Sequence, residues 1–164
     1  MTAVKLTWTD QERVELQRKC VDEHMALENG HHVDRVLPET FATDDVWYDI
    51  VPTAEHLDGL GEIQKFYDDL FATLPDIKIR VTHEYDVPGC CVREGVTSGT
   101  HSAEFLGIPA SGNFVAFPFV AMYIFGDDPT RLVAERAYWD NDMLMRQFKG
   151  ELEARLDYPW NTGQ

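Results

Sequence analysis

The sequence predicts an α+β domain in which the helices lie on one face of a strongly bent antiparallel sheet. Two long segments in the first half of the chain carry apolar residues at helical spacing. From residue 77 to residue 139 the pattern changes to strands separated by short turns. One of these strands, residues 114–125, is apolar at both alternating sets of positions, which is typical of a strand covered on both faces.

The first helix is predicted over residues 9–30. The segment Thr9-Asp10-Gln11-Glu12 has the capping-box pattern that starts a helix, and Gly30 favours its end. Gln17 and His24 are seven residues apart and lie in the middle of the apolar face of this helix. A polar group that faces a core is either hydrogen-bonded by its neighbours or lines a wet cavity. Both residues are therefore candidates for a buried site as well as for structural roles.

The remaining elements follow in order along the chain. A helical turn is predicted at residues 33–37, ended by Pro38, and a strand at residues 46–51, in which Asp49 shares a side with Trp47. A second amphipathic helix covers residues 61–74 and ends before Pro75. Four strands, at about residues 77–87, 91–105, 114–125 and 131–139, precede a last helix that begins at Asp140. Strict alternation in the first of these four strands predicts that His83 and Tyr85 face the core.

Composition restricts the class of protein. We expect a single domain over residues 1–164, with a core at about residues 9–150 and a C-terminal tail at 151–164. The chain has 29 acidic and 14 basic residues and a formal charge of −15. This charge repels phosphate backbones and anionic lipid surfaces, so we expect neither nucleic-acid nor membrane binding.

The compartment is expected to be cytoplasmic. The first ten residues show no basic region followed by an apolar run, so no secretory signal is expected. The three cysteines, Cys20, Cys90 and Cys91, do not form a C-x-x-C motif, which is consistent with a reducing environment.

The apolar strand at residues 114–125 also predicts the assembly. The few helices cover only one face of the sheet, so the other face would remain a large exposed apolar patch in a monomer. We therefore expect a two-fold homodimer formed through the sheet and centred on this strand.

Three segments resemble one known family, in its order and at its usual distances. They are GEIQKFYDDLFATLPDI, GTHSAEFLGIPASG and AYWDNDMLMRQF. Together they make residues 46–148 similar to the SnoaL-like polyketide cyclases of the nuclear transport factor 2-like superfamily. The resemblance implies a cone-shaped α+β fold with three or four helices packed on the concave side of the sheet.

The resemblance also implies a chemistry. Cyclases of this family act by general acid/base catalysis, with no metal and no organic cofactor, on an apolar carbonyl-containing small molecule that they close into a ring by an aldol reaction. Their catalytic carboxylate, at the end of the last strand, matches Asp140, and the G-T-H motif makes His101 its neighbour. If Asp140 is the base, Asp140→Asn removes activity but barely changes stability, because asparagine caps a helix about as well as aspartate.

Other interpretations remain open at the level of sequence. Asp140 also fits a plain helix cap. Asp49 lies where the related ketosteroid isomerases carry their base, so an isomerase that uses Asp49, with Tyr85 stabilising the enolate, is an alternative. Arg136 shares a strand side with Tyr138 and Asp140 and is a potential partner of that carboxylate, whose pKa it would lower. A third alternative is a non-catalytic dimeric module that binds a small molecule.

The candidate substrate-binding residues are all polar or aromatic side chains on predicted core faces or near the strand ends. They are Gln17, His24, Trp47, His83, Tyr85 and Arg136. If five candidates, Gln17, His24, His83, Tyr85 and His101, line a single wet pocket, they must meet in space although they come from separate elements.

Overall fold

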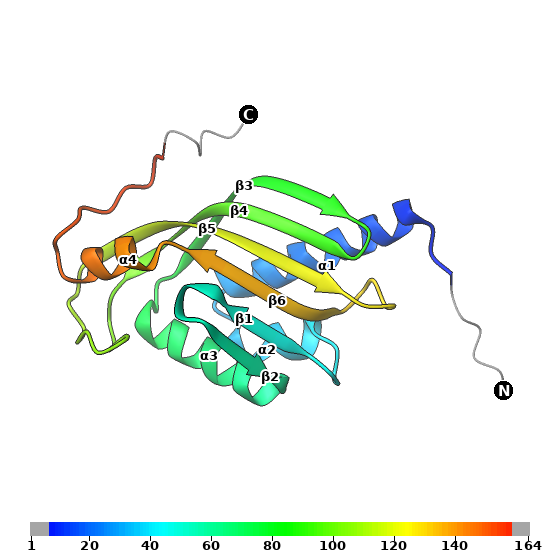
Figure 1. The fold of residues 1–164 in the computed structure, drawn as a ribbon, viewed down its shortest axis with the longest axis horizontal. Helices are drawn as coiled ribbons and strands as arrows, with labels where there is room; N and C mark the ends of the chain where they lie inside the picture. Colours follow the sequence, from blue (N-terminus) through cyan, green and yellow to red (C-terminus); the bar gives the residue numbers. More distant parts are fainter. Residues whose placement is uncertain (1–6, 159–164) are drawn as a thin grey trace.

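The computed structural model describes residues 7–158, which form four α-helices, a short 3-10 helix and six strands (Figure 1). The helices are α1 (Asp10–Asn29), α2 (Val33–Thr40), α3 (Gly59–Thr73) and α4 (Asn141–Phe148), and η1 is Val51–Thr53. The strands are β1 (Trp47–Ile50), β2 (Glu55–Asp58), β3 (Lys78–Val87), β4 (Cys90–Thr100), β5 (Phe114–Phe125) and β6 (Leu132–Trp139). Residues 159–164 of the predicted tail lie outside the described part of the chain.

The strands form one curled sheet in the order β2-β1-β6-β5-β4-β3. The four long strands β3 to β6 pair antiparallel with their neighbours in sequence, as their short connections predict. β1 lies parallel to β6, however, so the sheet is mixed rather than purely antiparallel. Between these two strands the chain passes through η1, β2, α3 and the long strands β3, β4 and β5, and β6 then runs beside β1 in the same direction. The predicted α+β class, with helices gathered against one face of a bent sheet, is confirmed.

The helices form as their sequence signals predict. Thr9 and Glu12 make the reciprocal capping box at the start of α1, and Gly30 follows its end. α2 extends beyond the predicted stop at Pro38 and ends at Thr40. The Thr40 hydroxyl donates to the Val36 carbonyl oxygen (2.5 Å), a local bond within the turn that contains the proline.

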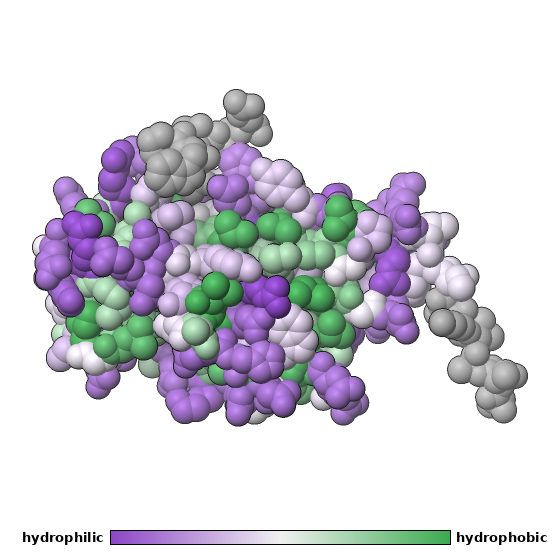
Figure 2. Space-filling model, viewed as in Figure 1, coloured by the Kyte–Doolittle hydropathy of each residue, from purple (hydrophilic) through white to green (hydrophobic). Residues whose placement is uncertain are grey.

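The two faces of the sheet differ in cover. Residues of β5 alternate between a buried inner set, which includes Phe119 and Tyr123, and an outer set that includes Val120, which is 37% exposed. α1, α2 and α3 lie on the inner side, behind or below the sheet in Figure 1. Figure 2 shows the opposite face, where hydrophobic residues gather over the long strands within a hydrophilic border. Within residues 7–158, Met143 of α4 and the segment around Tyr158 pack on one part of this outer face, against Val96 and Ala116.

A bulge in β3 reverses the predicted orientation of one segment. The register between β3 and β4 shifts between Val81 and His83. A bulge adds one residue to one strand, so the side chains that follow it change face. The prediction that His83 and Tyr85 face the core is therefore wrong: both lie on the outer face, where Tyr85 is 57% exposed, whereas the side chain of Asp86 is 3% exposed.

None of the helices within residues 7–158 combines the length and the apolar composition that crossing a bilayer requires.

Candidate functional site

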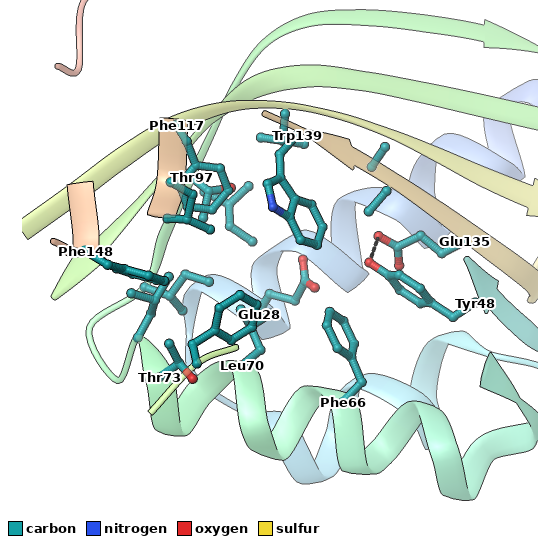
Figure 3. A pocket seen from close by; sticks show the side chains of 18 of the residues that line it. Glu28, Tyr48, Phe66, Leu70, Thr73, Thr97, Phe117, Glu135, Trp139 and Phe148 are labelled. Atoms are coloured by element: carbon teal, nitrogen blue, oxygen red, sulfur yellow. Dashed lines mark hydrogen bonds between the residues drawn. The ribbon is translucent and has the colours of Figure 1, made fainter. Parts of the chain in front are cut away.

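A mainly apolar cavity of about 90 Å³, open on one side, lies between the sheet and α3 (Figure 3). Its walls come from α1, α3, α4, the ends of β1 and β3, and the inner faces of β4, β5 and β6. Phe117, Phe148 and Thr97 lie at one end, and Glu135 and Tyr48 lie at the other. Glu28, from the last turn of α1, points into the space between these two ends. The cavity thus combines aromatic walls with two carboxylates.

The polar end is assembled by the alternation of neighbouring strands. Tyr123, Glu135 and Tyr48 occupy directly paired positions on β5, β6 and β1, so their side chains point to the same inner face. The Tyr48 hydroxyl donates to Glu135 Oε1 (3.0 Å), and the Tyr67 hydroxyl of α3 lies 3.4 Å from Glu135 Oε2. Glu135 is therefore a buried carboxylate held by hydroxyl groups from two different elements.

His24, from α1, contacts both glutamates and the Tyr67 hydroxyl. Its Nε2 lies 3.4 Å from Glu28 Oε1, 3.4 Å from Glu135 Oε2 and 3.0 Å from the Tyr67 hydroxyl oxygen. Its Nδ1 lies 2.9 Å from the Thr40 hydroxyl, whose single proton goes to a backbone carbonyl, so Nδ1 carries a proton and donates. Burial alone lowers the pKa of His24, but Glu28 and Glu135 outweigh it and raise this pKa to about 10. At neutral pH His24 is an imidazolium.

One imidazolium next to two carboxylates leaves a negative charge without a partner. Burial raises the pKa of Glu135 above that of an ordinary glutamate, although His24 opposes the shift. Glu28 is 5% exposed, and within the described chain its only polar side-chain contact is with His24. Glu135 therefore holds a proton at a higher pH than an exposed glutamate does. The cluster thus places carboxylates that can exchange a proton with a ligand at the wall of the cavity.

The residues matched by the family motif lie elsewhere. Asp140 is exposed and caps α4, its Oδ1 accepting from the Met143 amide (3.0 Å), and it does not line the cavity. His101 is fully buried and stacked on Phe148, with ring centroids 3.7 Å apart. Its Nδ1 lies 3.0 Å from the Ser111 hydroxyl, and burial lowers its pKa. Phe148 separates the cavity wall from His101, so the catalytic roles of Asp140 and His101 remain predictions from the sequence.

Asp49, Arg136 and Trp47 lie together on the outer face of the sheet. Arg136 Nε donates to Asp49 Oδ2 (2.7 Å), and its guanidinium carbon lies 5.3 Å from the centre of the Trp47 ring. The His56 ring nitrogen Nδ1 is 2.6 Å from Asp49 Oδ1. Burial is the largest single influence on Asp49 and opposes its ionisation, but the bonds and charges of His56 and Arg136 together outweigh it and lower its pKa. The partner of Arg136 is thus Asp49 rather than Asp140.

The five side chains predicted to share one pocket do not meet. Gln17 Nε2 donates to the Val87 carbonyl oxygen (3.1 Å), at the β3–β4 turn. His83 lies on the outer face next to Tyr85, and His101 lies at the far end near Phe148, so only His24 reaches the carboxylate cluster. The bulge in β3 and the curvature of the sheet separate the others.

Sequence reasoning missed Glu28, Glu135, Tyr48 and Tyr67. Two signals were present. Glu28 follows His24 by four residues, which places both on the same face of α1. Glu135 interrupts an otherwise apolar alternation, with Ala137 and Trp139 on its side of β6.

No group of three metal-ligating side chains arranged to hold an ion occurs in the described part of the chain. At the polar end of the cavity, the two carboxylates and the Tyr48 hydroxyl are instead paired with each other or with His24.

Comparison with solved structures confirms the fold. AclR from Streptomyces galilaeus, a proposed hydroxylase, superposes with a TM-score of 0.71 at 16% identity, over 85% of this chain and 98% of that chain. IdmH from Streptomyces antibioticus, a proposed polyketide cyclase, gives 0.65 at 22% identity, over 81% and 98%. A SnoaL-like polyketide cyclase from Agrobacterium tumefaciens gives 0.64 at 18% identity, over 80% and 96%.

The sequence has no significant match among curated proteins. The sequence model of the SnoaL-like polyketide cyclases, however, matches residues 18–148, a stretch that contains α2, α3 and all six strands. This chain belongs to the SnoaL-like polyketide cyclase family.

Proposed function

We propose that this protein is a general acid/base enzyme that acts on an apolar carbonyl-containing small molecule, with Glu28 as the base. The observation that carries the proposal is the pair of buried carboxylates, Glu28 and Glu135, that share the single imidazolium of His24 at the wall of an aromatic cavity. A general base must lie within reach of the proton that it removes, and Glu28 points into the cavity.

The two glutamates have different roles in this proposal. Glu135 is held by the Tyr48 hydroxyl and lies close to that of Tyr67, so it is fixed and serves to keep His24 charged and oriented. Glu28 accepts no such hydroxyl bond in the described chain and points into the cavity. Glu28 is therefore the carboxylate whose oxygens remain free to take a proton from a ligand in the cavity.

The reaction that fits is an intramolecular aldol closure. Glu28 removes a proton from a carbon next to a carbonyl, and the resulting enolate carbon forms a bond to a second carbonyl carbon of the same molecule. The new alkoxide then takes the proton back from Glu28. One C–H bond is broken, one C–C and one O–H bond are formed, and no electrons leave the substrate, so the step needs only an acid/base group.

The test follows proton abstraction directly. 2-Tetralone, an apolar bicyclic ketone, is incubated with the protein in D₂O, and loss of its α-proton signal is followed by NMR. The wild-type protein is expected to accelerate exchange above the buffer rate, and Glu28→Gln is expected to lower the protein-dependent rate about 10²-fold or more, since an amide cannot act as a base. Melting temperatures of both proteins confirm that the variant is folded.

Asp140→Asn is the matched control, because it also changes one carboxylate to an amide. We expect it to keep the exchange activity, since Asp140 caps α4 outside the cavity. Loss of exchange in Asp140→Asn with full exchange in Glu28→Gln reverses the assignment in favour of the family motif. A wild-type protein that binds 2-tetralone without accelerating exchange overturns the catalytic proposal and leaves a non-catalytic binding module.

A further inference from the structure

A wider hollow of about 670 Å³ adjoins the cavity on its open side. It lies between α3, the β1–β2 turn and the loop after β4. Phe66, Thr73, Phe105 and Trp139 line both spaces, so these four residues form the neck between them. A ligand that places one end in the cavity leaves its other end in this hollow.

The hollow is strongly acidic. Glu55, Glu62, Asp69 and Glu104 line it, against one basic residue, Lys65, which is paired with Asp69 at 2.5 Å. In the described chain the other three carboxylates have no ion-pair partner. They accept hydrogen bonds from neutral groups only, such as the Asp58 amide for Glu62. Concave surfaces lined by one sign of charge concentrate the potential and attract the opposite charge.

The residues of the neck also favour a positively charged ligand, for a second and independent reason. Three of its four side chains, Phe66, Phe105 and Trp139, are aromatic, and aromatic faces attract cations, tryptophan most strongly. Beyond the neck, Glu28 is buried, points into the cavity and shares its only cation with Glu135. Carboxylates and aromatic faces therefore continue from the hollow to the proposed base.

We propose that the ligand of this site carries a positively charged group, such as a protonated amine, that stays in the hollow while its apolar carbonyl end fills the cavity. This inference rests on the proposed function for the carbonyl end. Free carboxylic acids, and substrates tethered to a phosphate-bearing carrier, place negative charge in the hollow, where the carboxylates repel it. The reaction that supplies the substrate therefore releases it from any such carrier first.

Three matched ketones test the charge preference. They are 4-acetylbiphenyls with a methyl, an aminomethyl or a carboxymethyl group at the 4′ position, and binding to the full chain is measured by calorimetry at pH 7 and 20 mM NaCl. The aminomethyl ketone is expected to bind about fivefold tighter than the methyl ketone and the carboxymethyl ketone at least about fivefold weaker, as expected for one unit charge near others in water. At 500 mM NaCl the differences should shrink, because salt screens exposed charges.

Variants locate the effect. Glu62→Gln and Glu104→Gln, from opposite walls of the hollow, should each reduce the preference for the aminomethyl ketone without weakening the methyl ketone. Asp22→Asn removes the same unit charge from the exposed side of α1, none of whose residues lines the hollow, and should leave the preference unchanged. A methyl ketone that binds as tightly as the aminomethyl ketone overturns the inference but leaves the proposed function intact. Failure of all three ketones to bind removes the ligand site and with it both proposals.

Discussion

The paired strands β1 and β6 carry one carboxylate on each face of the sheet, and the two carboxylates have different surroundings. Tyr48 pairs with Glu135 on the inner face, and Asp49 pairs with Arg136 on the outer face, one residue further along both strands. Inside, the carboxylate is fully buried and its pKa is raised by that burial. Outside, the carboxylate meets a guanidinium and water, and its pKa is lowered. The difference shows that the cover over each face decides the chemistry of the side chains there.

The comparison also bears on catalysis. A carboxylate with a lowered pKa is a weaker base, whereas one with a raised pKa is a stronger base and holds a proton to a higher pH. The sequence offered two carboxylates as the base. Asp49, on β1, is ion-paired on the outer face, and Asp140, after β6, caps α4. Glu135, which sequence reasoning did not single out, occupies the inner face of the same strand that carries Arg136.

The largest effect on stability is expected from removal of the inner cation. His24→Leu leaves Glu28 and Glu135 buried without an opposite charge, which costs about 3–5 kcal/mol of unfolding free energy at pH 7. Urea denaturation of the variant and the wild type measures the loss. The loss should be smaller at pH 5, because Glu135, whose pKa burial raises, then takes up a proton more readily.

The control for that variant is His83→Leu, since His83 lies on the outer face next to Glu94 and is partly exposed. Surface ion pairs contribute about 0–1 kcal/mol, so this change should be small at either pH. Equal losses in the two variants would contradict the distinction between the inner and the outer face.

A second prediction concerns the outer face as an interface. Its exposed apolar side chains, among them Val120 and Tyr138, are consistent with the dimer that the sequence predicts through β5. Sedimentation at micromolar concentration is expected to give a dimer for the wild type and a monomer for Val120→Glu. Val51→Glu, which adds the same charge at an exposed apolar residue of η1, should remain a dimer. A monomeric wild type would contradict the predicted dimer.

The third prediction uses pH to separate the two sites. The pKa of His24 is raised in the folded protein, to about 10 from 6.5. Its contribution to stability is fully present below pH 6.5 and is lost as pH rises from there through 10. Unfolding free energies measured from pH 6 to pH 10 should therefore fall more steeply in the wild type than in His24→Gln, whose side chain does not titrate. Parallel curves would mean that His24 is not charged in the folded state.

The smallest effect is expected at the outer carboxylate. The pKa of Asp49 is lowered on folding, so its contribution is present above its unfolded pKa of about 3.8 and is lost as pH falls through the folded value. The ion pair with Arg136 is partly exposed, and such pairs contribute about 0–1 kcal/mol. Asp49→Asn should therefore lower stability by less than about 1 kcal/mol at pH 7, by urea denaturation, and leave ketone exchange unchanged. Loss of exchange would favour the isomerase alternative.

The sequence by itself determined the elements and the fold class of this protein. Capping signals, helical spacing and strand alternation are local properties of the chain, and they placed α1, α3, β5 and α4 close to their observed bounds. The short edge strand β2 was missed, because four residues with one half-buried leucine carry little periodic signal. β4 was predicted five residues too long, because its pairing with β3 and β5 stops at Thr100 but no glycine or proline follows in the sequence until Gly107.

The tertiary structure alone decided where the polar side chains meet. Alternation along a strand separates Tyr48 from Asp49 and Glu135 from Arg136, but it does not say which member of each pair faces the helices. That choice depends on the register between β1 and β6, which are more than 80 residues apart in sequence, and on the helices that cover one face. The bulge at His83 turned Tyr85 outward in the same way. A site built from α1, α3, β1 and β6 exists only after these long-range pairings form, because burial, which raises the pKa of Glu135, is a property of the assembled layers and not of any segment.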